Sequence, residues 1–201
     1  MFSCIDDAPS DFDNPDSNWN PSFSFPVGYS SLGMDIDSGF DTLLFLIDTL
    51  SGLPFWIDEI DVPISYTMPF NMQEINDFSE EIVSILFRLN TQNGFPNQVK
   101  FQLYFQDINS FNIDSMFVNG PLRFDSGTPI GNGEFINSTS NQTDIFIDQD
   151  KINDLGSTQY ILIEGLINNV ALDTSLISYY PNYSIDLQLG VQVELNMSIS
   201  N

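Results

Sequence analysis

The last part of the chain, residues 184–199, alternates without exception between apolar and polar or glycine positions. Successive side chains of a β-strand point to opposite faces, so this pattern predicts one long strand with an apolar face and a wet face. At a rise of about 3.3 Å per residue the strand would be about 50 Å long. Such a strand needs other strands beside it and a second layer that covers its apolar face. That face consists of Ile185, Leu187, Leu189, Val191, Val193, Leu195, Met197 and Ile199.

Further strands are predicted by the same alternation at residues 60–70, 82–89, 99–105 and 143–147, and by a continuous apolar run at residues 160–167. Asn93-Gly94-Phe95-Pro96 separates two of them. Asn-Gly readily supplies the positive φ angles of a tight turn, so we expect residues 82–89 and 99–105 to form a hairpin. Weaker strand signals occur at residues 23–27, 115–118 and 133–136. Residues 40–51 fit a helix, and a buried strand at residues 43–47 fits nearly as well.

Two features constrain the edges and ends of these elements. Pro63 and Pro69 cannot donate ladder hydrogen bonds, which places their strand at a sheet edge or beside a bulge. A short helix is expected from Asp148, an N-cap residue, to Gly156, and a second helical turn after Asn71. The predicted fold is mainly β, an antiparallel β-sandwich with one or two short helices. We expect residues 1–21 to form a flexible tether and residues 22–201 to form the sandwich domain, with a candidate sub-boundary near residues 71–80.

The amino-acid composition argues against several classes of function. The 201 residues include 28 acidic and four basic ones and no histidine, which gives a net charge of −24. Nucleic-acid binding depends on lysine and arginine, so we expect no nucleic-acid partner. Without histidine the usual general base and metal ligand are missing, and we predict that the protein is not an enzyme. The many carboxylates could include a glycosidase pair, but sequence spacing does not show which of them meet in space.

The only cysteine, Cys4, follows three residues that resemble the end of a bacterial lipoprotein signal peptide. In that interpretation Cys4 carries the lipid and the polar residues after it form the tether. The alternative is a free cysteine on an unstructured leader.

Several motifs resemble surface lipoproteins of Bacteroidetes-type bacteria. They are the Asn93-Gly94-Phe95-Pro96 turn, the strand end Tyr104-Phe105-Gln106-Asp107, residues 114–117 and residues 183–192. The resemblance covers roughly residues 82–199 and implies a β-rich, non-enzymatic domain lipid-anchored in the outer membrane and exposed at the cell surface. It also implies a role in surface export for acidic residues that follow the lipidated cysteine, here Asp6 and Asp7.

The sequence also contains one candidate metal site and three candidate glycosylation sites. Asp35, Asp37 and Asp41 present alternating oxygen donors that suit Ca²⁺, but the spacing lacks the glycine and glutamate of an EF-hand loop, which favours a solvated acidic loop. No other cofactor is expected. The resemblance further implies O-glycan attachment at Asp-Ser/Thr-apolar tripeptides, whose acceptors would be Thr42, Thr49 and Ser115.

The sequence therefore favours a non-catalytic surface lipoprotein that serves as an accessory or docking subunit of a larger outer-membrane protein complex. One alternative is a carbohydrate-binding module that stacks sugars on aromatic side chains such as Trp19, Trp56, Tyr179 and Tyr180, although such residues more often belong to a core. Another is a self-assembling pilin-like or fibre-like protein in which the C-terminal strand completes a neighbour's sheet.

Overall fold

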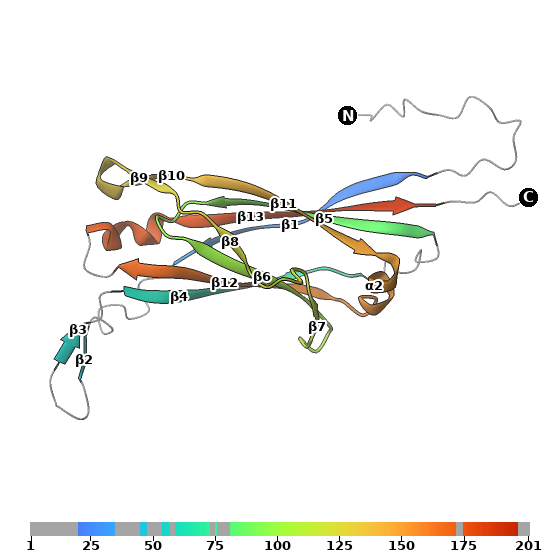
Figure 1. Cartoon of the computed structure of the whole chain (residues 1–201), viewed down its shortest axis with the longest axis horizontal. Coiled ribbons are helices and arrows are strands. Elements are labelled where there is room, and N and C mark those ends of the chain that lie inside the picture. Colours follow the sequence, from blue (N-terminus) through green and yellow to red (C-terminus); the bar gives the residue numbers. More distant parts are fainter. Residues whose placement is uncertain are drawn as a thin grey trace, which may run out of the picture.

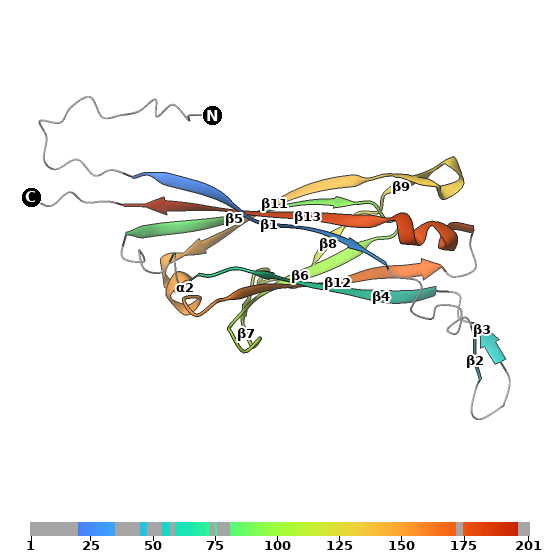
Figure 2. The same ribbon diagram turned by 180° about the vertical axis from the view of Figure 1, so that it is seen from behind.

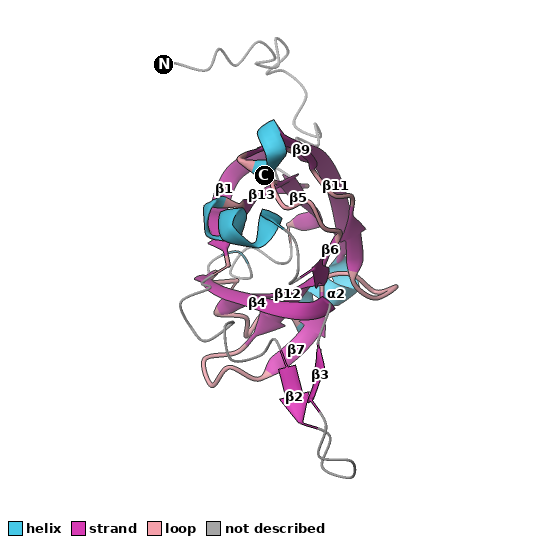
Figure 3. Cartoon of the chain, turned by 90° about the vertical axis from the view of Figure 1, so that its left-hand side faces the viewer, coloured by secondary structure: helices cyan, strands magenta, loops and turns pink. Residues whose placement is uncertain are grey.

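The structure is a computed structural model that describes residues 20–34, 45–47, 54–56, 59–72, 75, 81–171 and 175–196. These residues form mainly antiparallel strands in two packed sheets (Figure 1). The view from behind shows the same two layers (Figure 2), and the view along the strands shows them facing each other (Figure 3). The predicted antiparallel β-sandwich is confirmed.

The first sheet has four strands in the order β1-β13-β5-β11. Their bounds are Ser22–Gly33 for β1, Ser184–Leu195 for β13, Ile82–Asn93 for β5 and Thr139–Asp148 for β11. The second sheet has the order β4-β12-β6-β7, and β8 also pairs with β6. Its strands are β4 (Glu59–Pro69), β12 (Tyr160–Ala171), β6 (Val99–Gln106), β7 (Asn112–Ser115) and β8 (Leu122–Phe124).

The remaining elements are short. Two small hairpins pair β2 (Phe45–Ile47) with β3 (Pro54–Trp56) and β9 (Thr128–Ile130) with β10 (Phe135–Asn137). The 3₁₀ turns are η3 (Gly131–Gly133) and η4 (Ser175–Asn182), and α2 spans Gln149–Asp154. The predicted strands at residues 115–118 and 133–136 are thus displaced by a few residues to β7 and β10. No helix in the described part of the chain is long and apolar enough to cross a membrane.

The C-terminal strand β13 shows the predicted alternation, with its odd-numbered residues from Ile185 to Leu195 buried. The strand is shorter than predicted and ends at Leu195, although Asn196 still donates its backbone N–H to Glu81 O, beside the start of β5, at 2.6 Å. Residues 197–199 lie outside the described part. Hydrogen bonds to β1 on one side and β5 on the other occupy both edges of β13. The strand is therefore part of the protein's own core.

The predicted hairpin between residues 82–89 and 99–105 is wrong. β5 belongs to the first sheet and β6 to the second, so the Asn93-Gly94-Phe95-Pro96 segment carries the chain across the sandwich. The rings of Phe87 and Phe105 meet in the interior with their centroids 5.6 Å apart. Alternation alone could not separate the two arrangements, because either one buries the same apolar positions.

The connection between β5 and β6 is fixed by the buried side chain of Asn93. Its amide nitrogen donates to Asn97 O and Asp125 O, both at 2.9 Å, and its Oδ1 accepts the Phe95 N–H at 2.9 Å. Gly94 is not among the described residues with positive φ. Glycine is needed there for space, since a Cβ would lie 2.6 Å from Ser184 O, which accepts the Gly94 N–H at 2.9 Å.

Two local predictions are confirmed. Pro63 and Pro69 lie on β4, which is an edge strand whose hydrogen-bonded partner is β12. The predicted helix is α2, in which Asp148 Oδ1 accepts the Lys151 N–H at 3.2 Å, while Ile152 and Leu155 are buried. This cap and these two apolar residues explain why the short segment forms a helix at that point.

The strands before and after the predicted sub-boundary share both sheets. β1 pairs with β13 and β4 pairs with β12. The backbone continues this pairing past β4, where Phe70 and Met72 donate to Gln159 O and Thr158 O at 2.9 and 3.0 Å. The N-terminal strands are therefore integral to the sandwich.

Candidate functional site

Most of the predicted site residues lie outside the described part of the chain. These are the lipidation candidate Cys4, the export candidates Asp6 and Asp7, the Ca²⁺ candidates Asp35, Asp37 and Asp41, and the glycosylation candidates Thr42 and Thr49. Those sites stay predictions. Within the described residues, no group of three or more cysteine, aspartate or glutamate side chains is placed to hold a metal ion.

Ser115, the remaining glycosylation candidate, ends strand β7 and is half-buried. The neighbouring Asp114 accepts the Ser115 N–H at 2.7 Å and forms a 3.0 Å ion pair with Lys151 of α2. Burial by itself would raise the pKa of Asp114, but the hydrogen bonds from Lys151 and from the Ser115 N–H outweigh it and lower the pKa. Asp114 thus already links β7 to α2.

Tyr180, a predicted sugar-stacking residue, belongs instead to the core. It is 2% exposed, packs against Phe95 and Tyr183, and donates its hydroxyl hydrogen to Asn97 Oδ1. Tyr179 is half-buried against the same core. Trp19 and the side chain of Trp56 are outside the described part. The alternative weighed from the sequence, that such aromatics are core residues, is confirmed for Tyr180.

This packing predicts loss of stability at alkaline pH. Burial, together with the nearby Tyr183, raises the pKa of Tyr180 to about 12, against the opposing effect of the hydrogen bond to Asn97. Because the folded state favours the neutral phenol, this contribution is complete below pH 10 and is lost as pH rises toward 12. We expect the free energy of unfolding to fall by about 2–3 kcal/mol across that window.

Urea titrations between pH 9 and 12 measure this dependence. In Tyr180→Phe the free energy of unfolding should depend much less on pH. Tyr29→Phe, which changes a ring that is 57% exposed, should show the same pH dependence as wild type. An equal slope in wild type and Tyr180→Phe would contradict the assignment.

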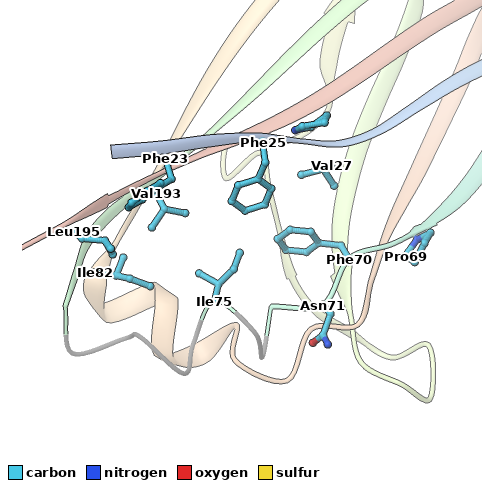
Figure 4. Close-up of a pocket in the computed structure, with 11 residues that line it drawn as sticks. Phe23, Phe25, Val27, Pro69, Phe70, Asn71, Ile75, Ile82, Val193 and Leu195 are labelled. Atoms are coloured by element: carbon cyan, nitrogen blue, oxygen red, sulfur yellow. The ribbon is translucent and has the colours of Figure 1, made fainter. Parts of the chain in front are cut away.

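The main candidate binding site is an apolar cleft at one edge of the sandwich. It lies between the N-terminal half of β1 and the chain that follows β4, and it encloses about 570 Å³. Figure 4 shows the side chains of Phe25, Phe70 and Ile75 pointing into the same space. The apolar residues that line it are Phe23, Phe25, Pro26, Val27, Pro69, Phe70, Ile75, Ile82, Val193 and Leu195.

The course of β1 explains why the cleft is open. The register with β13 shifts between Pro26 and Gly28, which marks a bulge at Val27. At Gly28 the strand passes so close to β4 that a Cβ would lie 3.0 Å from Met68 Sδ. The part of β1 before the bulge does not pack as closely against β4. There Phe23 and Phe25 remain 52% and 41% exposed.

The cleft is continuous with the hydrophobic core. Phe70 is only 7% exposed and meets Phe87 edge to face, with ring centroids 5.6 Å apart. This site was not predicted from the sequence. The pattern at residues 23–27 predicted a weak strand but did not indicate that its phenylalanines would be exposed to solvent. Only the pairing of β1 with distant β13, and the bulge in it, determines their exposure.

Comparisons with known proteins assign no family. No family model matches the chain, and no curated protein matches it. Among solved structures, it is similar to a candidate secreted protein from the Bacteroidetes member Parabacteroides distasonis, with 9% identity, a TM-score of 0.49, and coverage of 68% of this chain and 38% of that one.

Two further likenesses are weaker. The VP2 subviral particle of infectious bursal disease virus shows 10% identity and a TM-score of 0.37 over 88% of this chain and 32% of that one. The K1 cleaved adhesin domain of Lys-gingipain from Porphyromonas gingivalis shows 10% identity and a TM-score of 0.33 over 88% and 97%. The chain spans about a third of the length of the first two proteins. All three TM-scores lie below 0.5, so neither family nor function follows from them.

Proposed function

We propose that this protein is a non-catalytic accessory subunit that docks onto a larger outer-membrane protein assembly at the cell surface. The lipid anchor at Cys4 and the acidic residues Asp6 and Asp7 would locate it there. The apolar cleft beside β1 is the observation that carries the proposal. Exposed phenylalanines rimming a cleft joined to the hydrophobic core are the kind of surface on which protein partners concentrate their binding energy.

The cleft suits an extended apolar segment of a different protein. Among the described strands, β1 lies at one edge of the first sheet, so its outer backbone groups next to the cleft could accept an added strand. Pro26 offers no N–H and the bulge follows it, which restricts such pairing to the part of β1 that carries Phe23 and Phe25. Apolar side chains that enter the cleft would supply most of the affinity.

Charge favours a partner other than a second copy of the chain. Each copy has a net charge of −24, so two copies repel each other. Self-assembly through β13 is disfavoured as well, because both edges of that strand are already paired. We therefore expect the partner's apolar segment to be flanked by basic residues, and association to slow as salt is added.

Affinity purification from producing cells after mild detergent extraction tests the proposal. Wild-type protein should co-purify with a defined partner, and Phe25→Ser should reduce its recovery by about 30-fold, as expected for a central interface residue. Phe111→Ser is the matched control, since Phe111 is 71% exposed on the turn between β6 and β7, in the other sheet.

Circular dichroism and thermal melting should show that both variants remain folded. A monodisperse wild-type protein without any partner would contradict the proposal. So would undiminished recovery of the partner with Phe25→Ser.

A further inference from the structure

The outer face of the first sheet carries a regular polar surface, in contrast to the apolar lining of the docking cleft. Strand register aligns its outward side chains in rows across β1, β13, β5 and β11. The three central rows are Tyr29-Gln188-Asn90-Gln142, Pro26-Gly190-Arg88-Asp144 and Ser24-Gln192-Leu86-Phe146.

These rows are electrically neutral on a strongly acidic protein. Of 28 acidic residues in the chain, only Asp144 lies in them. It is paired with Arg88, one of the four basic residues, through two hydrogen bonds of 2.7 Å. Hydrogen bonding to Arg88 is also the main cause that lowers the pKa of Asp144. One further carboxylate, Asp186 in the next row, lines the second hollow and accepts the Ser31 hydroxyl hydrogen at 2.6 Å. The neutral central rows are a poor match for a cationic partner, and the surrounding charge repels an anionic one.

The face offers hydrogen-bonding groups that no other part of the chain occupies. Among the described residues, the side chains of Asn90, Gln188 and Gln192 and the hydroxyl of Tyr29 have no hydrogen-bond partner within the chain. Each amide can both donate and accept, which is what a ligand with many hydroxyl groups requires. Tyr29 adds an exposed aromatic ring at the end of one row.

Two adjoining hollows extend over this face. One encloses about 690 Å³ and the other about 480 Å³, and they share Tyr29, Asn90 and Gln188. Gly190 leaves the floor of the first hollow open, since a Cβ built there would contact only Phe25 O, at 3.7 Å. The glycine has no positive φ, so the backbone does not require it. The combined shape suits an elongated ligand better than a compact one.

We propose that this face binds a neutral, linear polysaccharide. Tyr29 would stack against a sugar ring, and the amides of Gln188, Asn90 and Gln192 would bond hydroxyl groups along the chain. Nucleic acids and anionic glycans are repelled by the net charge, and a protein partner would find few apolar side chains in these rows apart from Leu86 and Phe146. The first hollow adjoins the docking cleft, since Phe25, Pro26 and Val27 line both. The groups proposed to bind the polysaccharide nevertheless lie on the other face of the sheet, because Tyr29 and Phe25 lie on opposite faces of β1.

Native affinity electrophoresis tests the proposal, since the acidic full-length protein migrates well in such gels. Starch, mixed-linkage β-glucan, mannan and xylan serve as neutral probes, and polygalacturonate serves as the anionic one. At least one neutral polymer should retard the protein and polygalacturonate should not. Calorimetry with the matching hexasaccharide then gives the affinity.

Variants distinguish this face from other surfaces. Tyr29→Ala should weaken binding at least tenfold, Tyr29→Phe should retain it, and Gln188→Ala should weaken it about threefold. Phe111→Ala removes an exposed aromatic ring from the other sheet and should have no effect. Thermal melting should show wild-type stability for all four.

No retardation by any neutral polymer would overturn the proposal, as would preferential binding of polygalacturonate. If Tyr29→Ala and Gln188→Ala both left binding unchanged, the polysaccharide would bind elsewhere on the protein. That result would also overturn the proposal. None of these results bears on the docking cleft, which is tested by Phe25→Ser.

Discussion

Replacing Phe87 by alanine is expected to lower the free energy of unfolding by about 3–5 kcal/mol, the usual cost of truncating a fully buried phenylalanine. Phe87 is 0% exposed and its ring contacts both Phe70 and Phe105, so it joins the two sheets and supports the wall of the cleft. The loss would be a large part of the total stability of a typical domain, about 5–15 kcal/mol. Equilibrium unfolding in urea measures it.

Phe146→Ala provides the control for this substitution. Phe146 lies on the neighbouring strand β11, points to the opposite face of the same sheet and is 75% exposed. We expect it to change stability by less than about 0.5 kcal/mol. If the two variants lost equal stability, the assignment of inner and outer faces would be wrong.

Asn93→Ala is expected to destabilise the protein by about 3 kcal/mol. The substitution leaves the buried Phe95 N–H and the carbonyls of Asn97 and Asp125 without their partner, and each unsatisfied buried group costs about 1–3 kcal/mol, without simple additivity. Gln92→Ala, at an exposed neighbouring position with one side-chain hydrogen bond to Ser138, should cost below 1 kcal/mol.

Asn93→Asp sharpens this prediction. An aspartate can still accept the Phe95 N–H, but its second oxygen would face two carbonyl oxygens in place of the donating amide. Its folded pKa should be raised above the unfolded value, so stability should be greater near pH 4 than at pH 7 relative to wild type. An Asn93→Ala variant as stable as wild type would show that the connection between the sheets does not depend on this side chain.

The sequence predicted those elements that depend on one segment alone. Strict alternation was enough to identify β13, and a capping aspartate with two apolar residues was enough to identify α2. The prolines at 63 and 69 correctly indicated an edge strand. In each case the physical cause, whether side-chain direction, capping or a missing donor, acts within a few residues.

What the sequence did not predict depends on contacts between distant segments. Asn93-Gly94 has the composition of a hairpin turn, yet Gly94 is selected by its approach to Ser184, 90 positions away in the chain. The exposure of Phe23 and Phe25 depends on where β1 leaves β4. The neutral rows on the outer face exist because Tyr29, Gln188 and Asn90 come into register through two different strand pairings.

The predicted location and lipid anchor rest on the resemblance to surface lipoproteins and on residues outside the described part of the chain. The intact mass of the protein isolated from its native membrane would report an acyl group at Cys4. It would also report glycans at Thr42, Thr49 or Ser115. We expect a mass increase that corresponds to lipid, which sequential digestion should place on the N-terminal peptide.

The most direct test of docking through the cleft is site-specific photo-cross-linking in producing cells. A photoreactive phenylalanine analogue is placed at position 25 or, as the control, at position 111, and the adducts are identified by mass spectrometry. We expect one dominant protein adduct from position 25, attached through an apolar segment of the partner, and none from position 111. No adduct at position 25, or the same adducts from both positions, would contradict docking through the cleft.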